Sequence, residues 1–507
     1  MEIDSYHQTF IKEFTMATAS NSRPNIVIIC SDQHAFRYTG YAGHPIVKTP
    51  NMDRIAQNGV VFSNTYCGSP VCTPGRACLM TGMYPSDVGS YCNATVWDGS
   101  HPTWGTRLSN SGYDCRATGK FDLHDDLERG FKEINVSNGH CTRPDITSLF
   151  RSPPCYRMSE RIGVDGHARE NPHGDAKKTQ TALDFINTEA NNLNNPWLFW
   201  LGLSQPHPSF VAQQKYWDMY PEEEMDLPDI RQDDLENQHL VYQGMRHFKR
   251  IATPIPEDRI RRARAGYYGM ITELDAYIGQ VYDALKKTGQ LENTIFIYTS
   301  DHGESLGEHG LWYKNNLYEN AAHVPLIIAG PGLPKGTTID TPVAHVDLVT
   351  TLLDLSGTQI PPELRGHSLL PLIDNSPTDH PGWTYTESHS EGNCTGSFLI
   401  RKGDWKYMHF TWYDDLLFNL SEDPGEFTNR INDPNAQEPL TELRTILNIL
   451  VNTEQITRNA FIAQKHQLDK IASDKTEAEL ATYLAGRLGP GLAHVLASQY
   501  YAKQLST

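Results

Sequence analysis

The chain has 507 residues, of which 38% are hydrophobic and 21% charged, and its formal net charge is −18. This length is enough to bury a large core, and it allows two or three domains. The acidic balance argues against a nucleic-acid partner, because phosphate backbones attract Lys and Arg. No stretch of sequence approaches the roughly 20 apolar residues that span a bilayer, so we expect no membrane partner.

The N-terminal residues and the cysteines both indicate a reduced, cytoplasmic compartment. Residues 1–23 are polar and lack the apolar run of a signal peptide, so we predict a polar N-terminal extension. A signal removed by processing is the alternative. The nine cysteines form neither a CxxC pair nor a Cys/His zinc spacing. Most are therefore expected to be free thiols in the core.

Four short apolar runs are typical of buried strands, at 25–30, 197–203, 294–299 and 324–329. Helical patterns lie between them. Apolar residues from Tyr267 to Leu285 recur every four and three positions, and Gly289 is a plausible helix end. A shorter helix is predicted over 347–355, with Asp347 as its cap. Alternating strands and helices predict an α/β fold with a large, mostly parallel sheet sandwiched by helices.

Polar side chains follow three of these strands directly. Asp32 and Gln33 come after the first, His207 after the second, and Asp301 and His302 after the third. Ligands of open α/β sheets bind beyond the carboxyl ends of the strands. The sequence therefore predicts a functional site at this edge of the sheet.

The character of the chain changes near residue 380. Aromatic-rich, strand-like segments predict a small antiparallel sheet over 381–435, after a main α/β domain over 24–380. Residues 436–507 are predicted to form a helical tail, interrupted at 489–491. Its apolar positions could cover the chain's own domain or contact a second copy in a homo-oligomer. The acidic segment 221–236 is predicted to be a solvated loop.

The segment Cys72-Thr-Pro-Gly-Arg76 combines a nucleophile with features of an anion site. Pro74 favours a helix start, which places Cys72 at a helix N-terminus. Unpaired N–H groups and the helix dipole favour an anion there. Arg76 lies one turn further on, where it could hold that anion. These features alone are equally compatible with a buried cysteine in a helix cap.

The pattern Cys-x-Pro-x-Arg followed by four residues and Thr81-Gly82 resembles the signature of the type I sulfatases, in the alkaline phosphatase superfamily. Further segments of that family follow in the same order between residues 24 and 430: Asp32-Gln33, Thr118-Gly119-Lys120, Pro206-His207, Ser300-Asp301-His302-Gly303 and Lys314…Tyr318-Glu319. The Gln33 and His302 variants are similar to the choline-sulfatase and phosphonate-monoester-hydrolase branch.

The resemblance implies a hydrolase of sulfate monoesters, on a sulfated carbohydrate or a small alcohol such as choline sulfate. In this family a maturation enzyme oxidises the signature cysteine to Cα-formylglycine. The hydrated aldehyde attacks the sulfur of the ester, and its second hydroxyl later drives elimination of sulfate. Cys72 matches this position, and an unmodified cysteine lacks that second hydroxyl.

The resemblance also implies one divalent metal. Asp32, Gln33, Asp301 and His302 match the family's metal positions, with modified Cys72 as a further ligand. The metal acidifies the attacking hydroxyl and neutralises sulfate oxygens. Mostly oxygen ligands favour Ca²⁺, while the imidazole and the missing charge of Gln33 keep Mn²⁺ or Mg²⁺ open.

The remaining catalytic positions follow from the resemblance as well. Lys120 and Lys314 match lysines that bind the sulfate, and His207 matches the histidine that protonates the leaving oxygen. The family usually reads Gly-Lys-x-His, but Asp122 occupies that histidine position here. We therefore predict that His124, two residues later, assists elimination.

Substrate contacts are expected from loops over 92–104, 138–165 and 209–250. Asn93, His101 and Trp104 are the predicted substrate-binding residues; Asn93 resembles an Asn after the signature helix in the same branch. Other candidates in these loops are Arg143, Arg151, Arg157, Arg161 and Trp217. Basic side chains suit sulfated or carboxylated sugars, and aromatic ones suit a sugar face or a quaternary ammonium.

Two other functions remain compatible with the sequence. A phosphonate or phosphate mono- or diester hydrolase would use the same apparatus, and a substrate panel would separate it from a sulfatase. A non-catalytic binding protein that kept the fold is the second. The intact set of Cys72, the two lysines and the strand-end residues argues against it.

Overall fold

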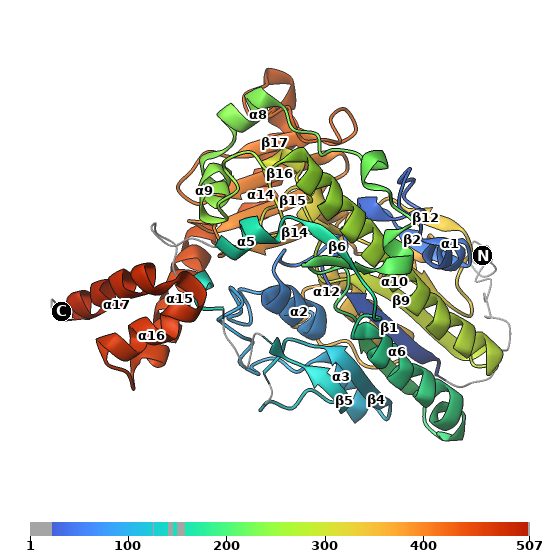
Figure 1. Ribbon diagram of the computed structural model, residues 1–507. Helices are drawn as coiled ribbons and strands as arrows, with labels where there is room; N and C mark the ends of the chain where they lie inside the picture. The colour runs from blue at the N-terminus through green and yellow to red at the C-terminus, as the bar shows by residue number, and fades with distance from the viewer. Residues whose placement is uncertain (1–22, 125, 140–144, 150–157, 505–507) are drawn as a thin grey trace, which may run out of the picture.

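The computed structural model describes residues 23–124, 126–139, 145–149 and 158–504. Its centre is an eight-stranded sheet in the order β12-β2-β11-β9-β1-β7-β4-β5 (Figure 1). Neighbouring strands are parallel except where β11 runs antiparallel to β2 and β9. The strands are β1 Asn25–Ser31, β2 Gly59–Phe62, β4 Asp114–Lys120, β5 Lys132–Ser137, β7 Trp197–Gly202, β9 Thr294–Ser300, β11 Leu326–Ala329 and β12 Thr337–Ile339.

Both faces of the sheet are covered by helices, which explains its continuous apolar strands. Along β1, Ile26 and Ile28 enter one core cluster while Val27 and Ile29 enter the other, because successive side chains point to opposite faces. One face packs against α2 (Cys72–Thr81), α3 (Trp104–Asn110) and α12 (His345–Leu355). The other packs against α1 (Pro50–Gln57), α6 (Asp175–Asp184) and α10 (Glu257–Lys287). The predicted α/β sandwich is confirmed.

Two sequence-based boundaries were wrong in detail. The run 324–329 divides at Pro325, which has no N–H for a sheet ladder, into β10 (His323–Val324) and β11. Strand β10 belongs to a separate three-stranded sheet with β3 (Thr65–Tyr66) and β13 (Val343–Ala344). Helix α12 starts at His345, so Asp347 is its third residue. Its carboxylate accepts the backbone N–H of Ala344 at 2.7 Å from inside the first turn.

The small C-terminal sheet lies at the top of Figure 1 and is antiparallel throughout. Its strands are β14 Trp383–Ser388, β15 Ser397–Lys402, β16 Trp405–Phe410 and β17 Leu416–Asn419. Helix α14 (Gln437–Leu450) packs on it through Leu440, Leu443 and Leu447. This agrees with the predicted subdomain architecture.

The tail continues as α15 (Thr453–Ala472), α16 (Glu477–Leu488) and α17 (Pro490–Gln504). Helices α16 and α17 form a hairpin that projects to the left in Figure 1. The predicted interruption falls at Gly489, whose φ of 77° lies in the left-handed region. The hairpin core includes Ile146 of a 3₁₀ turn over Ile146–Leu149.

Further short elements are β6 Gly166–Arg169, β8 Phe210–Gln213, α5 Met158–Gly163, α7 Gln214–Trp217, α8 Gln232–Asn237, α9 Leu240–Phe248, α11 Glu319–Ala322 and α13 Leu370–Ile373. The acidic segment predicted as a loop contains α8. No described helix combines the length and apolarity needed to cross a membrane. Residues 1–22 of the predicted N-terminal extension lie outside the described residues, and the domain limits, the oligomeric state and the cytoplasmic location stay predictions.

Candidate active site

The polar residues predicted at the strand ends meet at one edge of the large sheet. Strand β1 lies between β7 and β9, parallel to both. Asp32 and Gln33 therefore lie beside Asp301 and His302, and the backbone N–H of Gln33 donates to Asp301 Oδ1 at 3.0 Å. The His302 N–H donates to the same oxygen at 2.9 Å.

Helix α2 brings Cys72 to this edge as its first residue. The whole helix is buried, and its close approach depends on Gly75. A Cβ at Gly75 would lie 2.7 Å from the Ser69 carbonyl oxygen and 3.2 Å from that of Asp301. Only glycine lets the helix N-terminus sit directly on the loop that carries Asp301 and His302.

Four side chains form a compact, buried group that could hold a metal ion: Asp32, Cys72, Asp301 and His302 each offer one ligand atom, and these atoms all lie within 4.8 Å of one another. His302 Nδ1 lies 3.0 Å from the Gly303 carbonyl oxygen, which can only accept. Nδ1 therefore carries a proton, which leaves Nε2, 3.3 Å from Cys72 Sγ, as the ring atom that could bind a metal. This is the tautomer that a metal requires.

The two carboxylates of the group respond differently to their surroundings. Burial and the neighbouring Asp32 charge raise the pKa of Asp301. Burial would also raise the pKa of Asp32, but Lys120, Lys314 and His207 outweigh it and hold that pKa well below its usual range. Negative charge is thus concentrated in a water-poor cluster, which favours a bound cation.

Lys314 supplies one such positive charge. Its Nζ lies 2.8 Å from both Gln33 Oε1 and Cys72 Sγ, and the side chain is buried. Burial alone would lower its pKa, but the charges of Cys72 and Asp32 raise it. An ammonium in contact with two of the atoms predicted as metal ligands indicates that these atoms attract cations.

Lys120 lies on the other side of Asp32 and forms an ion pair with its carboxylate. Asp122 contacts the same ammonium at 3.1 Å and is buried. His124, in contrast, has a side chain that is 44% exposed, and its Nδ1 accepts the backbone N–H of Asp126. Among the described residues, Asp122 rather than His124 is thus brought to the site.

Arg76 binds an anion, as expected, but that anion is a carboxylate of the protein itself, Asp301. Its guanidinium donates to Asp301 Oδ2 at 2.9 Å and to the carbonyl oxygens of Lys120 and Ser31 at 3.0 and 3.4 Å. Both Arg76 and Asp301 are fully buried. Arg76 therefore ties the α2 helix to the ends of β1, β4 and β9.

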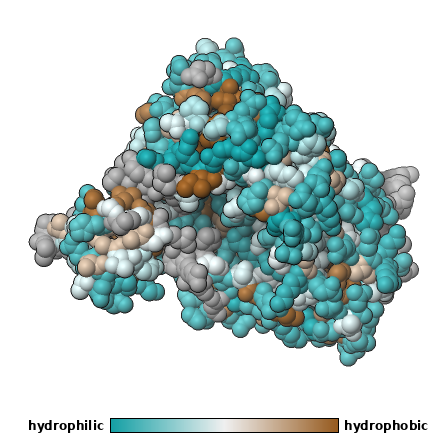
Figure 2. Space-filling view, viewed as in Figure 1, coloured by the Kyte–Doolittle hydropathy of each residue, from teal (hydrophilic) through white to brown (hydrophobic). Residues whose placement is uncertain are grey.

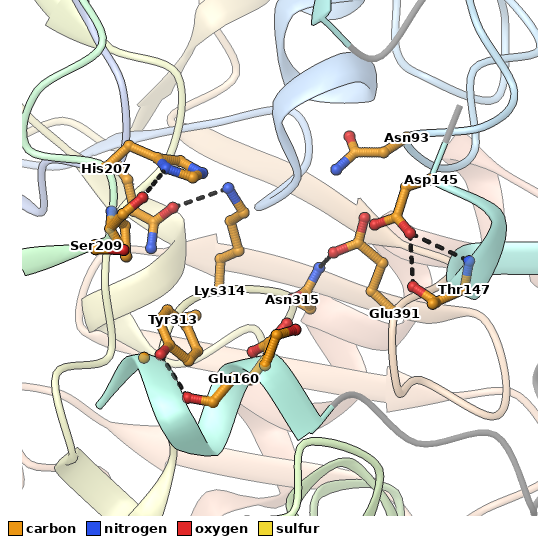
Figure 3. Close-up of a pocket in the computed structure, with 14 residues that line it drawn as sticks. Asn93, Asp145, Thr147, Glu160, His207, Ser209, Tyr313, Lys314, Asn315 and Glu391 are labelled. Carbon is orange, nitrogen blue, oxygen red and sulfur yellow. Dashed lines mark hydrogen bonds between the residues drawn. The ribbon is translucent and has the colours of Figure 1, made fainter. Parts of the chain in front are cut away.

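A pocket of about 250 Å³ (Figure 3) adjoins the cluster through Lys314, which lines the pocket and contacts Cys72. His207 and Ser209 lie on one side of it, Asn93 and Glu391 on the other, and the Lys314 ammonium points between them. Its described lining is Gln33, Asn93, Asp145, Thr147, Ser159, Glu160, Gly163, His207, Pro208, Ser209, Tyr313, Lys314, Asn315 and Glu391. Asn93 also accepts the backbone N–H of Thr73 at 3.0 Å, which fixes it beside the α2 N-terminus.

The sequence missed several of these residues. Ser209 and Asn315 adjoin predicted site residues, and this adjacency was the one signal available for them. Glu391 comes from the loop after β14 and accepts a hydrogen bond from Asn315 Nδ2 at 2.8 Å. Nothing in the local sequence distinguishes it from other polar loop residues.

Other predicted substrate contacts lie elsewhere. Trp104 is fully buried in the core, and its indole N–H donates to the Leu79 carbonyl at 3.0 Å, so it does not line the pocket. His101 and Trp217 are also absent from the described lining. Arg161 donates to backbone carbonyls of residues 250, 253 and 254. Arg143, Arg151 and Arg157 lie outside the described residues.

Most of the face in Figure 2 is hydrophilic, with apolar residues in separate small patches. Two of the pocket's acidic residues, Asp145 and Glu391, contact neighbouring groups rather than open solvent alone. The arrangement is that of a small pocket lined by polar side chains, with the Lys314 ammonium pointing into it.

Comparison with known proteins gives a consistent result. A family model described as Sulfatase matches residues 24–358, and one described as N-sulphoglucosamine sulphohydrolase, C-terminal, matches residues 307–453. Arylsulfatase K of Xenopus laevis is 30% identical over 474 residues, covering 88% of this chain and 86% of its own. The solved structure of a 2-O GAG sulfatase is 25% identical, with a TM-score of 0.67 over 90% of this chain and 94% of that one. Phosphonate monoester hydrolase of Agrobacterium radiobacter shares the fold, with a TM-score of 0.70 at 24% identity over 84% of this chain and 96% of its own.

The Arg76–Asp301 pair predicts a large stability effect. Arg76→Met leaves a buried carboxylate without its main partner, so the free energy of unfolding should fall by about 3–5 kcal/mol in urea titrations. Arg54→Met is the matched control, since its pair with Asp283 is exposed on both sides and should contribute less than about 1 kcal/mol. Equal losses for the two variants would contradict the assigned role of Arg76.

Proposed function

The chain belongs to the sulfatase family and hydrolyses sulfate monoesters, and from this premise we propose that it acts on a sulfated carbohydrate through formylglycine at position 72 and a divalent metal. The carrying observation is the position of Cys72, first in a buried helix and grouped with Asp32, Asp301 and His302. A maturation enzyme that converts Cys72 is the implied protein partner.

The residues around Cys72 fit both a formylglycine at position 72 and a divalent metal. Asp32, Asp301 and His302 would hold the metal with Gln33 Oε1, and three oxygen-bearing side chains beside one imidazole make Ca²⁺ our first expectation, with Mn²⁺ or Mg²⁺ as alternatives. When bound, the metal would acidify the formylglycine hydrate and neutralise sulfate oxygens. The chain's own lysines add to that neutralisation.

Lys120 and Lys314 are proposed to bind sulfate oxygens. Nearby negative groups outweigh burial and raise the pKa of each ammonium: Asp122 and Asp32 for Lys120, and Cys72 and Asp32 for Lys314. Charge-assisted hydrogen bonds from two sides would orient the sulfur toward residue 72. Asn93 adds a neutral amide to the pocket lining.

His207 is proposed to protonate the leaving oxygen. Its Nδ1 lies 2.6 Å from the Pro208 carbonyl oxygen, so Nδ1 carries a proton and donates. This leaves Nε2 as the atom that exchanges a proton with the leaving alcohol. The ring lines the pocket on the side opposite Asn93 (Figure 3).

The pocket favours a small hydroxylated group over an apolar one. Its volume of about 250 Å³ lies just below the range of roughly 300–1,000 Å³ for drug-sized ligands, and most of its lining residues have polar side chains. The similarity to a GAG sulfatase supports a sulfated sugar. Choline sulfate is the small-alcohol alternative.

A substrate panel tests this proposal. Protein co-expressed with a formylglycine-generating enzyme should show higher kcat/KM for sulfated sugars or aryl sulfates than for phosphonate monoesters and phosphodiesters. Cys72→Ala should lower kcat by at least about 10³-fold, because it removes the precursor of the nucleophile. Phosphonate turnover exceeding sulfate turnover by orders of magnitude would instead favour the alternative hydrolase.

Asp122 and His124 give a second prediction. Since Asp122 contacts Lys120, we propose that it, and not His124, supports the sulfate-binding lysine. Asp122→Asn should lower kcat by about 10–100-fold, whereas His124→Ala should change it by less than about 3-fold. Steady-state kinetics on one sulfate ester would measure both, and the reverse ranking would restore the assignment to His124.

A further inference from the structure

Glu304 contacts two separate parts of the site: Gln33, one of the predicted metal ligands, and the loop that carries Lys314. Its side chain is fully buried. Oε1 accepts the backbone N–H groups of Leu306 and Tyr313, at 2.8 and 2.6 Å. Oε2 accepts a hydrogen bond from Gln33 Nε2.

These contacts fix the direction of the Gln33 amide. An amide side chain has nearly the same shape in its two flipped orientations, so its hydrogen-bond partners must select one. A carboxylate accepts, which requires the NH₂ group on the Glu304 side. The Lys314 ammonium only donates, which requires the oxygen on its side, and Nζ lies 2.8 Å from Oε1. Two partners of opposite polarity therefore select the same orientation.

The backbone of Gln33 is fixed independently of Glu304. Its φ of 72° is in the left-handed region, its N–H donates to Asp301 Oδ1, and its carbonyl accepts the Tyr267 hydroxyl at 2.7 Å. With the backbone held, the flip of the terminal amide is the main freedom left to this side chain. Glu304 controls that freedom from the side away from the metal group.

Glu304 also holds the loop that carries Lys314. Tyr313 has a φ of 67° and precedes Lys314 directly, and its N–H is bound by the same carboxylate oxygen. On the far side of the loop, the buried Lys249 ammonium donates to the carbonyls of Trp312 and Lys314 at 2.9 and 2.8 Å. The loop is thus held between a buried anion and a buried cation.

We propose that Glu304 is a positioning residue that keeps Gln33 Oε1 turned toward the cation, so that Gln33 binds the metal through oxygen. The proposal rests on the proposed function, because it requires a metal in the Asp32–Asp301–His302 group. Without the Glu304 acceptor, Lys314 alone would select the orientation of the Gln33 amide, and a flipped amide would turn toward the cation an NH₂ group that binds no metal.

An exchange of the two side chains tests the proposal. In Glu304→Gln, Oε1 can keep the two backbone donors, so the new NH₂ faces Gln33 and forces its amide to flip. Ca²⁺ or Mn²⁺ affinity, measured by titration calorimetry with the metal alone, should fall by about 10–100-fold. In Gln33→Glu/Glu304→Gln, one oxygen of residue 33 accepts the reversed hydrogen bond and the other faces the metal, so affinity should return to at least the wild-type value.

Asp275→Asn is the matched control. Asp275 is also a buried carboxylate that accepts backbone N–H groups, from Asn51 and Met52 at the start of α1. Its substitution should leave metal affinity unchanged, which separates an effect of position from a general loss of buried charge. Circular dichroism would check that each variant folds.

Each outcome has a distinct meaning. Wild-type affinity in Glu304→Gln, or no recovery in the exchanged pair, would overturn the role of Glu304 and leave the proposed function intact. Should Glu304→Gln not fold, the exchanged pair decides: tight binding supports the reversed hydrogen bond, and weak binding contradicts it. A wild-type protein that binds neither Ca²⁺, Mn²⁺ nor Mg²⁺ would overturn the metal site and the inference together.

Discussion

Asp32 and Asp301 lie side by side at the ends of adjacent parallel strands, both buried beneath the N-terminus of α2. Carboxylates removed from water must be compensated by positive charge or hydrogen bonds. Arg76 compensates the charge of Asp301, and Lys120 compensates that of Asp32. The positively charged side chains of the site therefore lie where these buried carboxylates need compensation.

The need to compensate these buried carboxylates also explains why one site can bind both a cation and an anion. Arg76 is paired with Asp301 and Lys120 with Asp32, whereas Lys314 lines the pocket and contacts Gln33 and Cys72. A metal held by the carboxylates would relieve the ammonium groups, which can then contact sulfate. An acidic protein, with a formal net charge of −18, thereby presents a locally cationic floor to its substrate.

Much of this arrangement could be predicted from the sequence, because short motifs identified the polar residues at the strand ends and Cys72 at the α2 N-terminus. Cys72, Lys314 and the strand-end pairs were placed together in that way. Strand direction was not readable, because a buried apolar run looks the same in either direction, and β11 proved antiparallel to β9. The direction in which each side chain points could not be predicted from the sequence either.

Three residues illustrate that limit. Trp104 and Asn93 come from one predicted loop, yet the start of α3 turns Trp104 into the core while Asn93 lines the pocket. The chain turns at Asp122, with a φ of 53°, and this separates the buried Asp122 from the half-exposed His124 beyond it. Glu304 had no spacing signal, because its role depends on which way a distant amide points.

The central claim is that residue 72 acts as formylglycine and not as cysteine. Mass spectrometry of the peptide spanning residue 72, on preparations made with and without a maturation enzyme and then assayed for sulfate-ester hydrolysis, tests it most directly. Conversion exchanges the side chain's sulfur and two hydrogens for one oxygen. We predict that turnover rises in proportion to the converted fraction. Full turnover from protein that carries only unmodified Cys72 would contradict the account.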